Sequence, residues 1–247
     1  MIVALMGQDG SGKTTISTIV RRKLEEQGKK VQLRRGFDYF ILHFFVGSSS
    51  AKVESARDSF FRKSGKLKGV FLLWPYLVWL DFVLQKIYLE IFQRDSITLF
   101  DRYVADSWTG LEYFGYSSRL IRWLYVNFPK KFLCFVLDVP PEIGVQRKEF
   151  ENISKDDIDT LQKQLNFVSY INSEKSVTPT ENMKRAVLLR FYEVQRKRYL
   201  DLSSRFNAVL IDTSRPIQEV VSKICSEIEI YSRTKNKLSR PKTIAMR

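Results

Sequence analysis

The feature that most constrains the fold is an eight-residue run near the start of the chain, Gly7-Gln-Asp-Gly-Ser-Gly-Lys-Thr14, which matches the pattern G-x-x-x-x-G-K-[ST]. An apolar run at residues 2–6 precedes it, and apolar residues recur with helical spacing from Ile16 to Leu24. Glycines in a turn between a strand and a helix let successive backbone N–H groups point at phosphate oxygens, and the helix N-terminus adds positive potential. The run therefore predicts a loop that binds the phosphates of a nucleotide.

Two side chains of this loop have expected roles in phosphate chemistry. Lys13 should reach the β- and γ-phosphates of ATP, and the Thr14 hydroxyl should bind Mg²⁺. We therefore predict ATP and Mg²⁺ as cofactors. The residues of the loop that are expected to contact the nucleotide are Gly7, Gln8, Asp9, Gly10, Ser11, Gly12, Lys13, Thr14 and Thr15.

Strand-like and helix-like segments alternate along the chain, which favours an α/β fold with a parallel sheet. Gly28 predicts the end of the first helix, and a closing helix is expected over about 216–231. We predict one domain over residues 1–231. The short apolar runs that predict strands lie at 2–6, 31–33, 97–100, 132–139 and 208–211.

Charge and cysteine usage bear on partners and localisation. The formal net charge is +14, and the last 15 residues hold six cations and no acid. We expect residues 232–247 to form a basic, disordered tail, and its contact with nucleic acid or membrane lipid is a secondary hypothesis. Cys134 and Cys225 lie far apart in apolar surroundings, which favours buried thiols over a disulfide and predicts a cytoplasmic protein.

Two further motifs lie where phosphate-binding groups are expected. Asp101-Arg102-Tyr103 follows a strand-like run, and a carboxylate there faces the crevice at the carboxyl ends of parallel strands. Asp101 is a candidate for the Mg²⁺ site and Arg102 for a phosphate contact; a surface ion pair is the alternative interpretation. Further on, a Pro-Pro pair at 140–141 begins a helix that carries Arg147 two turns later.

In this order and spacing, the motifs resemble those of the thymidylate kinase family of P-loop nucleoside monophosphate kinases. The family combines G-x-[DE]-x-x-G-K-[ST]-T, then D-R-[YH] after a strand, then L-D-x-P-P-E before a basic lid. Residues 196–224 are similar to the family's closing pattern, so the resemblance spans residues 1–230. It implies a P-loop NTPase fold with a five-stranded sheet of order 2-3-1-4-5, a helical lid and, as the family default, ATP-dependent conversion of dTMP to dTDP.

The resemblance also implies roles for single residues. Asp9 would approach the sugar hydroxyl of the acceptor, unless it only shapes the loop. Arg102 would bind the acceptor phosphate together with Arg35, or with Arg34 if that side chain faces the site. Arg147 would stabilise charge on the transferring phosphoryl group. The residues that would lie beside the adenine of ATP are Thr213, Ser214 and Arg215.

An apolar segment precedes the D-R-Y strand. Residues 69–80 carry no charge, but twelve residues are too few to cross a bilayer, so we expect a buried or interface helix, with membrane-surface association as the alternative. Members of the family commonly pair through helices at this place. The resemblance therefore implies a homodimer that uses residues 70–92.

The chain departs from the family at the base-binding residues. Thymidylate kinases carry a Phe and an Arg on the helix before the D-R-Y strand, yet this chain has no Arg between 62 and 94, and the Arg position falls near Leu80. Gly110 and Leu111 occupy the second base-contacting position, with Tyr113 close by as the candidate substrate-binding residue. Selectivity for thymine is therefore not supported by the sequence.

The lid is also different, because the segment 147–195 is longer than in the family and reads as an enlarged helical insertion. The nucleotide loop carries no Arg, so a cationic group over the phosphates must come from this segment. Its candidates are Arg147, Lys148 and Arg185.

Two alternatives to a nucleoside monophosphate kinase stay open. A kinase of a hydroxyl acceptor, such as a nucleoside or a sugar, needs a carboxylate as general base near the second strand, and Asp38 is the candidate. A nucleotide-binding regulator would keep the phosphate loop without an acceptor site. The lysine, the carboxylate and the arginines of the motifs are of most use in chemistry, which favours an enzyme.

Overall fold

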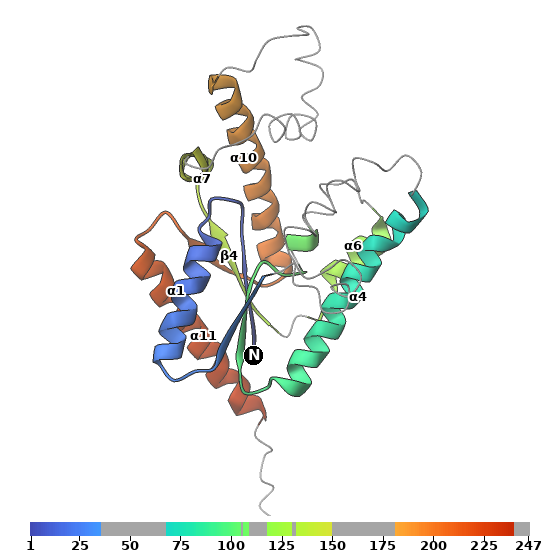
Figure 1. Ribbon diagram of the computed structural model, residues 1–247, viewed down its shortest axis with the longest axis vertical. Helices are drawn as coiled ribbons and strands as arrows, with labels where there is room; N and C mark the ends of the chain where they lie inside the picture. The colour runs from blue at the N-terminus through green and yellow to red at the C-terminus, as the bar shows by residue number, and fades with distance from the viewer. Residues whose placement is uncertain (36–67, 105, 109–117, 130–131, 150–180, 240–247) are drawn as a thin grey trace, which may run out of the picture.

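The computed structural model describes residues 1–35, 68–104, 106–108, 118–129, 132–149 and 181–239. Its centre is a five-stranded sheet in which all neighbouring strands are parallel, in the order β2-β3-β1-β4-β5 (Figure 1). The predicted α/β fold, its strand positions and its strand order are confirmed. The strands are β1 (Ile2–Met6), β2 (Val31–Arg35), β3 (Ile97–Asp101), β4 (Leu133–Asp138) and β5 (Val209–Asp212).

The central strands are continuous apolar runs because helices cover both faces of the sheet. Side chains alternate between the faces along β1: Val3 and Leu5 pack under α1 (Lys13–Glu26) and α11 (Ile217–Ser239). Ala4 and Met6 belong to the opposite core. That core is covered by α4 (Lys68–Phe92), α6 (Arg119–Val126) and the end of α10 (Glu181–Arg205). Figure 1 shows α1 and α11 on one side of the sheet and α4 and α6 on the other.

The first helix ends at the predicted glycine. Gly28 has φ +77°, and its N–H donates to Glu25 O at 2.8 Å while the N–H of Lys29 donates to Leu24 O at 3.1 Å. These two bonds form the Schellman motif that satisfies the last carbonyls of a helix, and its left-handed residue is usually glycine. The chain is thereby turned from α1 into β2.

The closing helix is longer than predicted. Helix α11 runs to Ser239 instead of ending near 231, so residues 232–239, which the sequence assigned to the tail, are helical. The apolar face from Val220 to Ile228 is buried, and the helix continues beyond that face through polar residues. The residues after 239 lie outside the described ranges. Cys134 and Cys225 are buried free thiols, as expected.

Helix α4 presents two different faces. Val78, Phe82 and Leu89 are buried in the core, whereas Leu73, Leu77, Leu80, Ile87 and Ile91 are exposed. The Leu80 side chain is 46% exposed, so the position where the family's base-reading Arg was expected lies on the outer face. Asp81 and Gln85 are buried instead. Within the described ranges, no helix is long and apolar enough to cross a membrane.

Candidate active site

The phosphate-binding loop connects β1 to α1 at the carboxyl end of the sheet and is packed closely against β4 and α7 (Pro141–Glu149). A Cβ added to Gly7, which has φ +152°, would lie 2.5 Å from Leu137 O. One added to Gly10, which has φ +77°, would lie 2.6 Å from Gly144 O. Both contacts are with backbone oxygens, which cannot rotate away, so these two positions require glycine.

Lys13 lies across the inside of the loop. Its Nζ donates to Gly7 O at 2.8 Å and to Gln8 O at 2.7 Å, and it lies 3.8 Å from Asp9 Oδ1. Burial and then the positive charge of Arg102 lower the pKa of Lys13 to about 8. The ammonium group is thus held among carbonyl dipoles at the point where phosphate oxygens would arrive.

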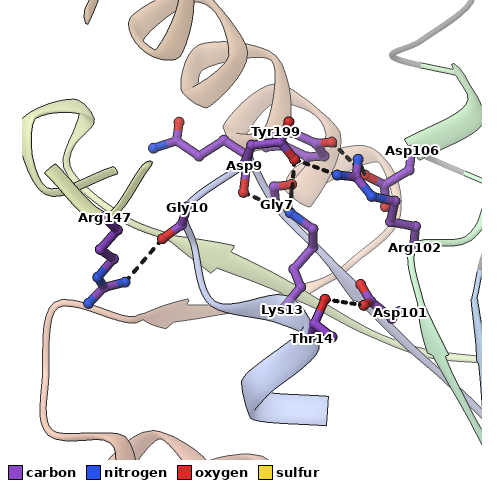
Figure 2. Close-up of polar contacts among 11 residues, drawn as sticks. Gly7, Asp9, Gly10, Lys13, Thr14, Asp101, Arg102, Asp106, Arg147 and Tyr199 are labelled. Carbon is purple, nitrogen blue, oxygen red and sulfur yellow. Dashed lines mark hydrogen bonds and ion pairs between the residues drawn. The ribbon is translucent and has the colours of Figure 1, made fainter. Parts of the chain in front are cut away.

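The two predicted metal ligands are in contact. Thr14 Oγ1 donates to Asp101 Oδ2 at 2.7 Å, across the gap between the start of α1 and the end of β3 (Figure 2). A hydroxyl and a carboxylate are oxygen donors of the kind that Mg²⁺ prefers. In the described part of the chain, no three His, Cys, Asp or Glu side chains cluster as a metal site. The donor set fits an ion that is completed by nucleotide phosphates and water.

Arg102 turns back over the loop from the end of β3. Its backbone is left-handed, with φ +75°, a conformation that costs a non-glycine residue roughly 1–2 kcal/mol. The N–H of Arg102 donates to Leu5 O at 3.0 Å, and its Nη2 pairs with Asp9 Oδ1. Burial alone would lower the Arg102 pKa, but the charges of Asp9 and Asp106 outweigh it and raise the pKa.

Asp106 is a member of the site that the sequence motifs did not identify. It lies in the helical turn after β3, and its Oδ1 is 3.8 Å from Arg102 Nη1. The same oxygen accepts a hydrogen bond of 2.5 Å from Tyr199 Oη of α10. Burial raises the Asp106 pKa, against the opposing effects of Arg102 and Lys13. Figure 2 shows these side chains gathered with Asp9 and Lys13.

Arg147 joins the phosphate loop to the loop after β5. Its Nη1 donates to Gly10 O at 3.2 Å and its Nη2 to Thr213 O at 2.9 Å. Thr213 in turn donates from Oγ1 and from its backbone N to Asp138 O, at 2.9 and 2.8 Å. Arg196 of α10 grips the Asp138 carboxylate with two bonds of 2.7 and 2.8 Å. The ends of β4 and β5 are therefore tied to the phosphate loop and to α7 and α10.

A cavity of about 320 Å³ opens beside the phosphate loop. Two of the three residues predicted to lie beside the adenine, Thr213 and Arg215, line it, and apolar side chains of α1 and α11 complete its wall. Ser214 is different, because its N and Oγ both bond to Asp212 Oδ1, at 2.9 and 2.5 Å. The lining residues are Ser11, Gly12, Thr15, Ile16, Arg147, Thr213, Arg215, Ile217 and Val220.

The predicted acceptor residues are only partly brought together. Arg102 and Asp9 are in contact, and Arg35 is the strand partner of Asp101 at the carboxyl end of β2. Arg185 is exposed near the start of α10. Tyr113, Asp38, Gly110, Leu111 and the side chain of Lys148 lie outside the described residues.

Comparison with known proteins adds to this geometry. No protein-family model matches the chain. It is 24% identical over 233 residues to a protein of Archaeoglobus fulgidus named "Probable thymidylate kinase", an alignment that covers 94% of this chain and 96% of the relative. It is 25% identical over 232 residues to a protein of the same name from Sulfurisphaera tokodaii, covering 92% of this chain and 97% of the relative.

These alignments run almost the whole length of both relatives, which share one name, and the sheet has the strand order that the motifs predict. The chain is a divergent relative of these probable thymidylate kinases.

Proposed function

We propose that the chain transfers the γ-phosphoryl group of ATP to a nucleoside monophosphate, with dTMP as the first acceptor to test. The single observation that carries the proposal is the arrangement at the carboxyl end of β1 and β3. Thr14 bonds to Asp101 beside Lys13, and the same Asp9 oxygen lies close to Lys13 and pairs with the Arg102 guanidinium. A donor phosphate site at Lys13 and Thr14 would therefore adjoin an acceptor anion site at Arg102.

The residues on the donor side would bind and orient the triphosphate. The loop N–H groups and Lys13 would hold phosphate oxygens, and Arg147, already 3.2 Å from Gly10 O, would add positive charge from the lid side. Thr14 and Asp101 would hold Mg²⁺, which neutralises charge on the transferring group when it is bound. Apolar side chains of the 320 Å³ cavity would take the base of ATP.

On the acceptor side, Arg102 would bind the monophosphate. A phosphate oxygen is already ionised and needs no general base, so catalysis rests on placing two phosphates in line and on balancing their charge. Arg102 suits this task because a guanidinium offers several fixed donors to a phosphate. A bound acceptor phosphate would have to share the Arg102 guanidinium with Asp9 or displace Asp9 from it.

A kinase of a hydroxyl acceptor is the second candidate. It needs a carboxylate as general base beside the phosphate site, and the Asp9 carboxylate is 38% exposed and lies 3.8 Å from Lys13 Nζ. Arg102 and Lys13 both stabilise its ionised form, so a hydroxyl acceptor would have to separate Asp9 from Arg102 before Asp9 could accept a proton. The non-catalytic regulator is the third candidate. It would keep the nucleotide contacts and show no acceptor-dependent reaction.

The test is release of ADP from Mg-ATP with each of a panel of acceptors, using Lys13→Ala as the blank. The panel contains dTMP, dUMP, UMP, CMP, AMP, GMP, thymidine and a few sugars. Stimulation by dTMP supports the family function, and stimulation by another monophosphate supports the reaction with a different base. Stimulation by hydroxyl acceptors alone would refute the monophosphate proposal. ATP binding without ADP release for any acceptor would support the non-catalytic regulator.

We also propose that the chain forms a homodimer through α4. The exposed residues Leu73, Leu77, Leu80, Ile87 and Ile91 follow one another at intervals of three, four or seven residues, which is the spacing of a helix-packing seam. A second copy would cover this stripe. Light scattering on the wild type and on Leu80→Glu tests the proposal. The wild type should be a dimer and the variant a monomer, and a monomeric wild type at high concentration would refute it.

A further inference from the structure

Arg102 is held by two carboxylates that differ in their access to solvent. Asp9 is 38% exposed, whereas the Asp106 side chain is only 1% exposed. Both pair with the terminal nitrogens of the guanidinium, Asp9 with Nη2 and Asp106 with Nη1. An anion arriving from solvent can compete with Asp9 for Arg102. It cannot reach Asp106, which stays behind the guanidinium.

The buried carboxylate is itself held by α10. Tyr199 Oη donates to Asp106 Oδ1 at 2.5 Å, and Tyr199 is fixed in turn because it belongs to the core together with Leu202 of the same helix and Phe206 just beyond its end. One turn earlier, Arg196 grips Asp138 at the end of β4. Tyr199 therefore projects from an anchored part of α10. Its hydroxyl orients the Asp106 carboxylate from a helix that is distant in the sequence.

A guanidinium that is held on one edge presents its other donors in a fixed direction, which is the support that a binding group needs in order to be preorganised. The left-handed backbone at Arg102 directs the side chain toward the phosphate loop. The side-chain χ angles are not fixed by the backbone and depend on contacts with neighbouring groups. Asp9 cannot supply that support once an acceptor competes for the guanidinium. Asp106 is the carboxylate that can.

Resting on the proposed function, we propose that Asp106 and Tyr199 form a positioning pair for the acceptor site. Asp106 holds Arg102 when the acceptor phosphate replaces Asp9, and the Tyr199 hydroxyl fixes the Asp106 carboxylate. Neither side chain touches the reacting atoms. The pair is a determinant of acceptor binding, and it connects Arg102 to α10.

The test compares Tyr199→Phe and Asp106→Asn with a matched control, Tyr125→Phe. The control also removes a buried tyrosine hydroxyl, one that donates to Pro75 O at 3.1 Å in the core between α4 and α6. Steady-state kinetics give separate KM values for ATP and for the acceptor. We expect the acceptor KM to rise by about tenfold in both site variants, as for loss of a hydrogen bond to a charged group, with the KM for ATP changed by less than about twofold. Tyr125→Phe should change neither.

A second readout does not depend on activity. In ¹⁵N NMR spectra, the Arg102 side-chain N–H signals, assigned with Arg102→Lys, should exchange with water faster in Tyr199→Phe and Asp106→Asn than in the wild type and the control. A wild type that reacts with no acceptor would refute the proposed function, and this exchange measurement would still decide the positioning pair. Unchanged exchange in the two variants, or equal rises in both KM values, would overturn the pair.

Discussion

The close contact between Gly10 and α7 gives a prediction that can be tested against an internal standard. Gly10 and Gly28 both have φ +77°, but a Cβ at Gly10 would lie 2.6 Å from Gly144 O, whereas a Cβ at Gly28 would meet nothing within 4 Å. Substitution by alanine therefore imposes the same backbone conformation at both positions. Only Gly10→Ala adds a clash between the phosphate loop and α7.

The two costs can be separated in magnitude. The left-handed backbone costs alanine roughly 1–2 kcal/mol, and alanine recovers about 0.4–1 kcal/mol because it restricts the unfolded chain. Gly28→Ala should therefore lower the free energy of unfolding by about 0–1.6 kcal/mol. Overpacking against a backbone oxygen adds about 1–3 kcal/mol, so Gly10→Ala should lose about 1–4.6 kcal/mol.

The clash should also weaken nucleotide binding, because Gly10 O accepts the hydrogen bond from Arg147 Nη1. Separating Gly10 from Gly144 would move the loop away from α7 and break this bond. We expect Gly10→Ala to bind ATP more weakly and Gly28→Ala to bind it as the wild type does. Urea denaturation and ATP titration measure the two effects. Equal unfolding free energies and equal ATP affinities for both variants would refute the packing argument.

Three further predictions concern single side chains of the site and its core. The Tyr103 hydroxyl is buried within an aromatic cluster and has no hydrogen-bond partner among the described residues, so Tyr103→Phe should keep or raise the free energy of unfolding, by up to about 1 kcal/mol in urea denaturation. Burial raises the pKa of Asp106, so the folded chain binds more protons than the unfolded chain above the ordinary carboxyl pKa of 3.8, and the Asp106 contribution to stability falls as pH rises through that window. The free energy of unfolding of Asp106→Asn should thus rise relative to that of the wild type as pH rises, and a variant that loses stability relative to the wild type over this range would contradict the prediction. Arg147→Lys replaces the two guanidinium nitrogens that bond to Gly10 and Thr213 with one ammonium nitrogen on a shorter reach, and kcat should fall about 100-fold, as for removal of one charge-stabilising donor; a change in the KM for ATP alone would show that Arg147 contributes to ATP binding and not to the transfer step.

The fold was predictable where its signals are local. The strands have four to six residues, four of the five are mostly apolar, and each falls within a residue or two of its predicted place. The phosphate loop is a contiguous motif whose glycines are required by its own geometry. Thr14 and Asp101 meet because Asp101 ends β3, and α1 begins after the loop that follows the neighbouring strand β1. The end of α11 was missed because the apolar face that predicts the helix stops before the helix does.

The parts of the site that were not predicted depend on long-range contacts. Asp106 follows Arg102 by four residues, which is a helical ion-pair spacing, but the sequence gives no sign that this carboxylate is buried or that Tyr199, 93 residues away, bonds to it. Leu80 was placed by counting back from Asp101. Helical periodicity would have put it with Leu77 and Ile87 on the outer stripe, and Asp81 and Gln85 on the opposite face.

This difference bears on how the chain could differ from its relatives in one half of the proposed site only. Phosphate contacts would come largely from backbone N–H groups, glycines and a few charges at strand ends, whose geometry follows from the fold itself. Contacts to the base of the proposed acceptor would come from side chains, where one substitution changes the chemistry without disturbing the sheet. Here the inner face of α4 carries a buried carboxylate, Asp81, and a buried amide, Gln85, whose oxygens accept hydrogen bonds. A chain built in this way could carry out the proposed phosphoryl transfer with an acceptor other than dTMP, and for that reason the acceptor panel has to extend beyond dTMP.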